Sequence, residues 1–184
     1  IGIEYKSNAV FARAVYYNRT IDNGIDYNYI DYNFFNYIRQ KVNGTELEFN
    51  WKANEKNNIS LNYTLMNGQE TNQNRVTTTD TITYNYLLKR PKNTAGIQWS
   101  FEASPKLSLS IAARYISKRY DVGGYAAEDV SLKSYTILNV HIQYKYNKHI
   151  LLYADAQNIG NTVFQEINGY NAIGRMVQFG IRLN

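Results

Sequence analysis

Apolar and polar residues alternate along most of the chain. Residues 106–115 place Leu107, Leu109 and Ile111 at every second position, and residues 136–146 repeat the pattern. Because successive side chains of a strand point to opposite faces of a sheet, a period of two predicts β-strands. Seven further segments complete a set of nine, at residues 1–5, 9–21, 45–52, 59–65, 95–101, 150–157 and 177–183. The segment at 9–21 is the weakest match, since Phe11 and Val15 share a face with Arg13.

The connections between the predicted strands alternate strictly between short and long. The short ones are polar turns at residues 7–8, 54–57, 103–105 and 147–148, and the long ones cover residues 22–33, 68–85, 119–133 and 158–174. In an up-and-down meander, this order collects the short turns at one end of the sheet and the long loops at the other. Transmembrane β-barrels have this asymmetry, whereas a Greek-key sandwich has no reason to sort its loops.

The two faces of the predicted sheet also fit a membrane barrel, which is apolar outside, polar inside and edged by aromatic girdles. Apolar-face aromatic residues gather near the short turns, at Phe49, Trp51, Trp99, Phe101, Tyr144 and Tyr146, while Tyr16 and Tyr115 lie near the long loops. We expect Leu109, Leu138, Val140, Ile142 and Phe179 to face lipid, and Arg114, Asn139, His141 and Gln143 to face the lumen. The expected fold is an all-β transmembrane antiparallel up-and-down β-barrel.

Composition narrows the function classes. The chain has 184 residues, no Cys and 15% aromatic residues, of which 18 are Tyr. No apolar run approaches the ~18 residues of a membrane helix. The formal net charge is +5, but Lys and Arg are distributed along the chain and form no basic stripe, so no nucleic-acid partner is expected.

Nine strands do not make a closed bacterial barrel, because single-chain barrels have even strand numbers and an open edge in lipid leaves backbone groups unpaired. The first strand is also shorter than the ~9–11 residues that cross a bilayer. We therefore expect residues 1–184 to be the C-terminal portion of a larger barrel, with the plug and the earlier strands outside this chain.

An ordered set of short motifs resembles the TonB-dependent outer-membrane receptors. These are Leu-Leu-Lys-Arg-Pro-Lys-Asn at 87–93, Arg-Tyr-Asp at 119–121, Ser-Tyr-Thr at 134–136, Asp-Ala-Gln-Asn-Ile at 155–159 and Gly-Tyr-Asn-Ala-Ile-Gly-Arg at 169–175, with weaker similarity at 21–27 and 42–48. The run at 87–93, and Glu166 before Gly169-Tyr170, are most similar to the cobalamin receptor branch. One departure is the end of the chain, where the family usually has an aromatic residue and this chain has Asn184.

The resemblance implies a location, a function and a set of partners. It implies that these nine strands are the last of a plugged barrel of twenty-two strands in the bacterial outer membrane. It also implies TonB-dependent uptake of a corrinoid such as cobalamin, with an N-terminal plug pulled by TonB and a surface lipoprotein as a candidate partner. The alternatives are a siderophore or haem receptor of the same family, a passive porin, and a surface adhesin barrel.

The same resemblance implies three ligand-binding residues. Tyr170 lies in the last long loop, where the cobalamin branch contacts its ligand, and its amphipathic ring suits a corrin edge. Lys89 and Arg90 could attract a nucleotide phosphate, although the family motif favours Arg where this chain has Lys89. The other interpretation makes Tyr170 a girdle residue and gives Lys89 and Arg90 contacts to the plug.

No enzyme, cofactor or metal site is expected. His141 and His149 have no partner at ligand spacing, and Asp22, Asp26 and Asp31 miss the spacing of a calcium loop. Several charged residues are expected in the lumen, where a plug requires polar partners, so acid–base catalysis is not needed to explain them. They are Glu46, Glu48, Lys52, Arg114, Asp155 and Arg182.

Overall fold

The computed structural model describes residues 1–28, 32–77, 80–124 and 127–183, and within these ranges every regular element is a strand. The strands are β1 (Gly2–Lys6), β2 (Val10–Asn28), β3 (Asn33–Asn54), β4 (Asn57–Gln73), β5 (Thr81–Tyr84), β6 (Asn93–Ser104), β7 (Leu107–Ile116), β8 (Arg119–Asp121), β9 (Val130–Leu132), β10 (Tyr135–Lys145), β11 (Ile150–Gln157), β12 (Gln165–Ile167), β13 (Tyr170–Asn171) and β14 (Met176–Leu183). None of the described residues form a helix long and apolar enough to cross a membrane.

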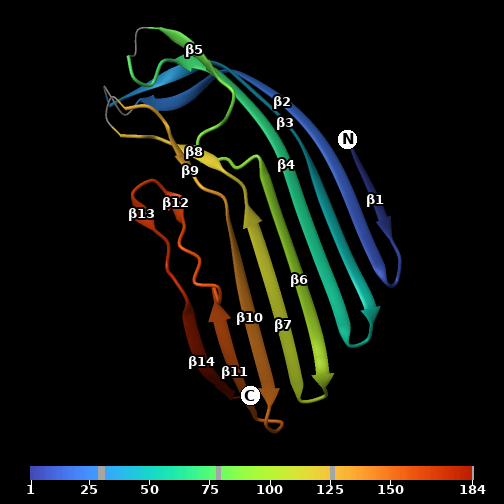
Figure 1. The fold of residues 1–184 in the computed structure, drawn as a ribbon. Helices are drawn as coiled ribbons and strands as arrows, with labels where there is room; N and C mark the ends of the chain where they lie inside the picture. Colours follow the sequence, from blue (N-terminus) through green and yellow to red (C-terminus); the bar gives the residue numbers. More distant parts are fainter. Residues whose placement is uncertain (29–31, 78–79, 125–126, 184) are drawn as a thin grey trace.

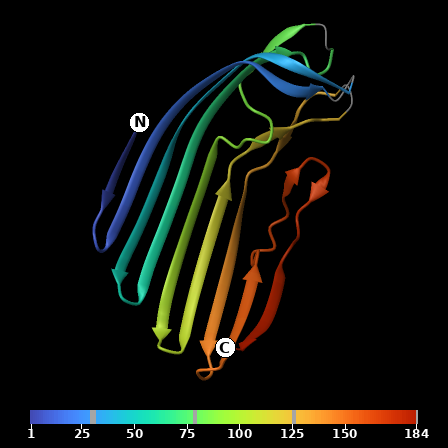
Figure 2. The ribbon, with the colours of Figure 1, turned by 180° about the vertical axis from the view of Figure 1, so that it is seen from behind.

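One curved antiparallel sheet contains the nine predicted strands. Its order is β1-β2-β3-β4-β6-β7-β10-β11-β14, so each strand pairs with its predecessor in the meander, and β5 pairs with the end of β4. The sheet forms an open trough, with the short turns at one end and the long loops at the other (Figure 1). Strands β1 and β14 form its two edges and both run toward the short turns (Figure 2). The predicted all-β meander is confirmed as a partial barrel.

The pairing register confirms the predicted faces. Leu109 pairs with Ile142, and Ile111 pairs with Val140. The same apolar row continues across the next strands, where Ala154 pairs with Phe179. The polar row beside it joins Ser110, His141, Asp155 and Gln178.

The segment at 9–21, whose alternation of apolar and polar residues is weak, also forms part of a strand of the sheet. Ala12 pairs with Phe49 and Ala14 with Leu47 on the apolar face, while Arg13 pairs with Glu48 on the polar face. Arg13 and Glu48 form an ion pair of 2.8 Å there. The alternation was weak because Phe11 and Val15 flank Arg13 on the polar face.

Two of the predicted long loops are shorter than expected, because the strands continue beyond the barrel wall. Strand β2 has 19 residues and β3 has 22, against the ~9–11 that cross a bilayer. Cross-strand contacts support this extension, including an ion pair of 2.6 Å between Arg39 and Asp22 and an edge-to-face contact between Tyr27 and Phe34. Within the loop at 119–133, β8 pairs with β9, and within the loop at 158–174, β12 pairs with β13.

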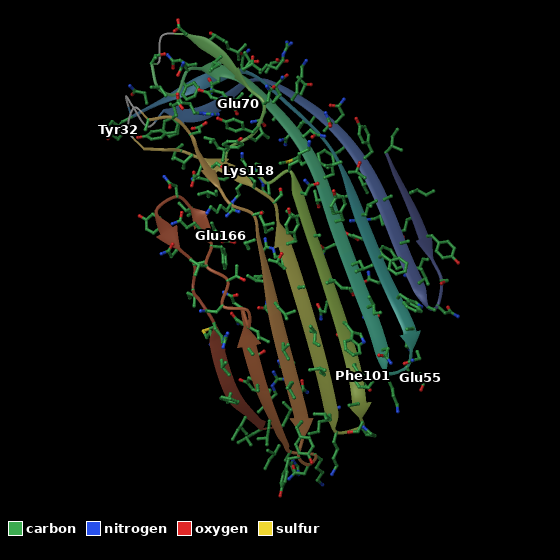
Figure 3. All side chains as sticks on the ribbon, in the orientation of Figure 1. Tyr32, Glu55, Glu70, Phe101, Lys118 and Glu166 are labelled. Atoms are coloured by element: carbon green, nitrogen blue, oxygen red, sulfur yellow. The ribbon has the colours of Figure 1, made fainter. Side chains whose placement is uncertain are left out.

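The packed core of the described chain lies near the long loops. The buried hydrophobic residues include Leu87, Ile116, Leu132 and Tyr135, which come from loops and strand ends at this end of the sheet. Figure 3 shows Glu70, Lys118 and Glu166 at the same end, and Phe101 and Glu55 at the opposite end. The described loop residues therefore pack against the strand ends.

Candidate functional site

A cavity of about 600 Å³ lies at the loop-bearing end of the sheet, on the polar face of β2, β3 and β4. Residues 87–90, with Val122, Gly124, Ala127 and Asp129, complete its wall. The charged lining residues are Arg19, Arg75, Lys89, Arg90, Glu70 and Asp129, and the aromatic ones are Tyr17, Tyr27 and Phe35. The cavity therefore combines aromatic surface with an excess of cationic side chains.

Arg75 is held between two buried carboxylates. Its Nη2 atom lies 2.7 Å from Glu70 Oε1 and its Nη1 atom lies 2.6 Å from Asp129 Oδ2, while the guanidinium covers the Tyr84 ring. Gln40 Nε2 donates a further hydrogen bond to Glu70 Oε2. Buried carboxylates require such pairing, so this cluster joins β4 to the segment before β9 and leaves the Arg75 charge compensated.

Tyr86 joins the same cluster to β8. Its hydroxyl donates to Asp129 Oδ2 at 2.8 Å, and its ring stacks on Tyr120 with centroids 3.9 Å apart. Burial, followed by the Asp129 carboxylate, raises the pKa of the Tyr86 hydroxyl. The hydroxyl therefore remains a proton donor at neutral pH.

The structure brings two of the three predicted site residues, Lys89 and Arg90, to the cavity wall. Lys89 has a left-handed backbone with φ of 59°, and its N–H donates to Tyr120 O at 2.7 Å. Its Nζ atom lies 3.7 Å from Asp121 Oδ1. None of the ion pairs among the described residues includes Arg90 or Arg19.

Tyr170, the third predicted residue, lies outside the cavity wall. It begins β13, directly after the turn at Gly169, and the residue is 72% exposed. Strand β8 holds this hairpin, because Arg119 Nη2 donates to Gln165 O and Asn168 N donates to Asp121 Oδ2. Glu166 accepts a hydrogen bond from the Tyr135 hydroxyl.

The other predicted polar residues have structural partners. His141, for which the sequence spacing showed no partner, lies across the strand pair from Asp155, with 2.7 Å between Nδ1 and Oδ1. Asp22 pairs with Arg39, whereas Asp31 and the side chain of Asp26 lie outside the described residues. Within the described chain, no group of three acidic, His or Cys residues could hold a metal ion.

Sequence analysis missed the cluster around Arg75. Its members are far apart in the chain, since Arg75 and Asp129 are separated by 54 residues. They also lie in or beside long connections where no periodic pattern assigns a face. Only the position of Arg75 in a polar loop was visible, and that feature is common to most surface arginines.

Comparisons with known proteins agree with this arrangement. A family model described as TonB dependent receptor-like, beta-barrel, matches residues 1–159. A protein described as the probable TonB-dependent siderophore receptor PiuA of Acinetobacter baumannii is 26% identical over 132 residues, which cover 68% of this chain and 17% of that protein.

Solved structures show the same fold. The siderophore receptor PiuA from Acinetobacter baumannii superposes with a TM-score of 0.79 at 20% identity, covering 99% of this chain and 27% of that one. The Ferric-Catecholate import receptor Fiu from K12 E. coli gives 0.77 at 15% identity, covering 100% and 27%. The FrpB iron transporter from Neisseria meningitidis gives 0.76 at 16% identity, covering 99% and 30%.

Proposed function

The chain belongs to the TonB-dependent receptor family, in the part that forms the β-barrel. We propose that the whole protein imports an anionic metal chelate. The chain lies in the bacterial outer membrane, as the family does. It spans 17% of the curated relative that it matches, so the activity of the whole protein is inferred from the wall and loops described above.

The observation that carries this proposal is the charge of the cavity wall. Arg19, Lys89 and Arg90 line the cavity in addition to Arg75, whose charge is compensated by two carboxylates. A cleft lined by one sign of charge focuses its potential and attracts ligands of the opposite sign. Guanidinium groups also donate paired hydrogen bonds to anionic oxygens, which suits the oxygen ligands of an iron chelate.

A ferric siderophore is the ligand class that we favour. The relatives above are described as a siderophore receptor, a ferric-catecholate import receptor and an iron transporter. A cavity of about 600 Å³ also falls within the range of small-molecule sites, ~300–1,000 Å³, so it can hold a compact chelate.

A corrinoid such as cobalamin is the second candidate. The run at 87–93 and Glu166 before Gly169-Tyr170 are similar to the cobalamin receptor branch. A corrinoid carries a phosphate that Lys89 and Arg90 could bind, and a macrocycle edge that the exposed Tyr170 ring could cover. In this form of the proposal the ligand extends from the cavity to the β12–β13 hairpin.

The proposed transport requires partners outside this chain. We propose that earlier strands pair with the free edges of β1 and β14, that a plug fills the lumen, and that the TonB complex acts on the plug. A surface lipoprotein could deliver the ligand to the loop-bearing end. The polar rows of the sheet, such as the one containing His141 and Asp155, would then face the plug.

Binding to the purified full-length receptor distinguishes the two ligands. We expect a ferric tris-catecholate anion to bind more tightly than cyanocobalamin in parallel titrations. The reverse order would favour the corrinoid receptor. Failure of both to bind a correctly folded receptor would contradict the proposed ligand classes.

A further inference from the structure

Asp121 is a buried carboxylate at the meeting point of three segments. Its residue exposure is 0%, and it lies at the end of β8. Oδ1 accepts a hydrogen bond from Val122 N at 2.9 Å, and Oδ2 accepts one from Asn168 N at 2.8 Å. The described cation that pairs with it is Lys89, whose Nζ lies 3.7 Å from Oδ1. A buried charge is costly unless it is paired and hydrogen-bonded, so all three contacts matter.

Lys89 connects this carboxylate with the cavity. Its side chain is 49% exposed and lines the cavity, although its Nζ also lies near Asp121. Its left-handed backbone is fixed by the hydrogen bond to Tyr120 O and by the bridge between Leu88 and Tyr120. A non-glycine residue in this conformation persists only where its surroundings impose it. The loop thus holds Lys89 at a position from which its ammonium group can pair with either Asp121 or an anion in the cavity.

The β12–β13 hairpin depends on β8 for its position. Gln165 O accepts from Arg119 Nη2 at 2.7 Å, and Asn168 Nδ2 donates to Val122 O at 3.2 Å. The hydrogen bond from Asn168 N to Asp121 completes the attachment. The acceptor of this third bond is a carboxylate. The cation paired with that carboxylate is Lys89, which also lines the cavity. Tyr170 lies two residues after Asn168, so this bond fixes the base of the turn that carries Tyr170.

We propose that the Lys89–Asp121 pair couples occupancy of the cavity to the position of the β12–β13 hairpin. This inference rests on the proposed function, because it requires an anionic ligand in the cavity. An anionic group that draws Lys89 Nζ away leaves the Asp121 carboxylate without its cation. A buried carboxylate without its cation destabilises the closed arrangement, and opening of the hairpin relieves this cost because it lets water reach the carboxylate. Ligand binding therefore loosens the hairpin that carries Tyr170.

Hydrogen exchange at the Asn168 amide measures this coupling in the full-length receptor. We expect Lys89→Met to speed exchange of this amide roughly tenfold, because a buried carboxylate left without its cation destabilises the closed position of the hairpin. Lys118→Met is the matched control, since Lys118 is exposed and packs on the Tyr120 ring at 5.0 Å. Asp121→Asn should also speed exchange, and adding Lys89→Met to it should change nothing further. If Lys89 had only a structural role, the effects of the two substitutions on exchange at the Asn168 amide would add.

The ligand step is tested with the same receptor and a saturating ferric tris-catecholate anion. We expect the chelate to raise Asn168 exchange in the wild type to the level of Lys89→Met, and to leave Asp121→Asn unchanged. Bound chelate with unchanged or slower Asn168 exchange would overturn the coupling while leaving the proposed function intact. Absence of binding, measured by calorimetry on the same samples, would contradict the proposed function and the ligand step together. Equal exchange in Lys89→Met and Lys118→Met would overturn the role of Lys89 whether or not the chelate binds.

Discussion

Arg75 and Arg90 line the same cavity, but their guanidinium groups have different surroundings. Arg75 lies between Glu70 and Asp129 and is largely buried, whereas Arg90 is exposed. A cation that already has two carboxylate partners must lose them before it can bind a ligand anion. At the residue scale, we therefore propose that Lys89 and Arg90 bind the ligand and that Arg75 holds the loops together.

Replacing Arg90 should weaken chelate binding without unfolding the receptor. Arg90→Gln removes a charge and a forked donor from the cavity wall, and for an exposed group we expect a loss of about 1 kcal/mol, or roughly fivefold in Kd. Titration of the full-length receptor with a ferric tris-catecholate anion measures this change. Lys92→Gln is the control, because Lys92 is exposed and is not part of the cavity wall. Equal losses in the two variants would remove Arg90 from the site.

Tyr170 distinguishes a corrinoid ligand from a compact chelate. Its ring lies outside the cavity wall, so only a ligand that reaches the β12–β13 hairpin can contact it. If the ligand is a corrinoid, Tyr170→Ala should weaken its binding by ~1–2 kcal/mol, the scale of one aromatic anchor. Cyanocobalamin affinity that stays unchanged in a normally inserted Tyr170→Ala receptor would exclude Tyr170 from the site.

At the element scale, the alternation of side chains predicted the nine strands of the sheet and both of its faces. The register, with Leu109 opposite Ile142 and Ser110 opposite His141, follows that alternation directly. The upper ends of β2 and β3 were not predictable, because beyond the membrane both faces of a strand meet water and the period disappears. There, pairs such as Asp22 with Arg39 stabilise the ladder, and their partners cannot be identified from spacing.

The face assignment predicts opposite responses to one substitution at neighbouring positions. Val140 lies on the apolar face and Asn139 on the polar face of β10. Val140→Arg should destabilise the folded receptor by ~2–4 kcal/mol, the cost of an Arg in the middle of the bilayer, whereas Asn139→Arg should cost less. Reversible unfolding in lipid vesicles measures both. Comparable destabilisation by the two variants would contradict the assignment.

The Arg75 cluster predicts how the loops respond when one partner is lost. Arg75→Met leaves the Glu70 and Asp129 carboxylates buried without their cation, which typically costs ~3–5 kcal/mol. We expect this loss in the local stability of the segments around residues 70–75 and 129, measured by hydrogen exchange. The triple variant Arg75→Met, Glu70→Gln, Asp129→Asn should recover part of it, because no buried charge remains. A triple variant as unstable as the single one would show that the charges do not determine the stability of the loops.

At the scale of the whole molecule, the described chain is a wall with a loop layer and two free edges. Strands β1 and β14 each have one partner, and unpaired backbone groups are not tolerated in lipid. The strand pattern therefore predicted the membrane location, which the family confirms, while the need for further strands stays a prediction. The site was only partly predictable. The resemblance in short motifs pointed to Lys89 and Arg90. The carboxylates that neutralise Arg75 could not be predicted, because folding alone brings them next to it.

Energy-dependent uptake by intact cells tests the central claim most directly. The full-length receptor should be expressed in a bacterial strain that lacks its own chelate receptors, with and without a functional TonB complex. We predict that a radiolabelled ferric tris-catecholate anion accumulates in cells with TonB, and only binds to the surface of cells without it. Equal accumulation in both strains would indicate a passive pore. Accumulation in neither strain, with the receptor inserted and its ligand bound, would show that the barrel does not serve TonB-dependent uptake of this chelate.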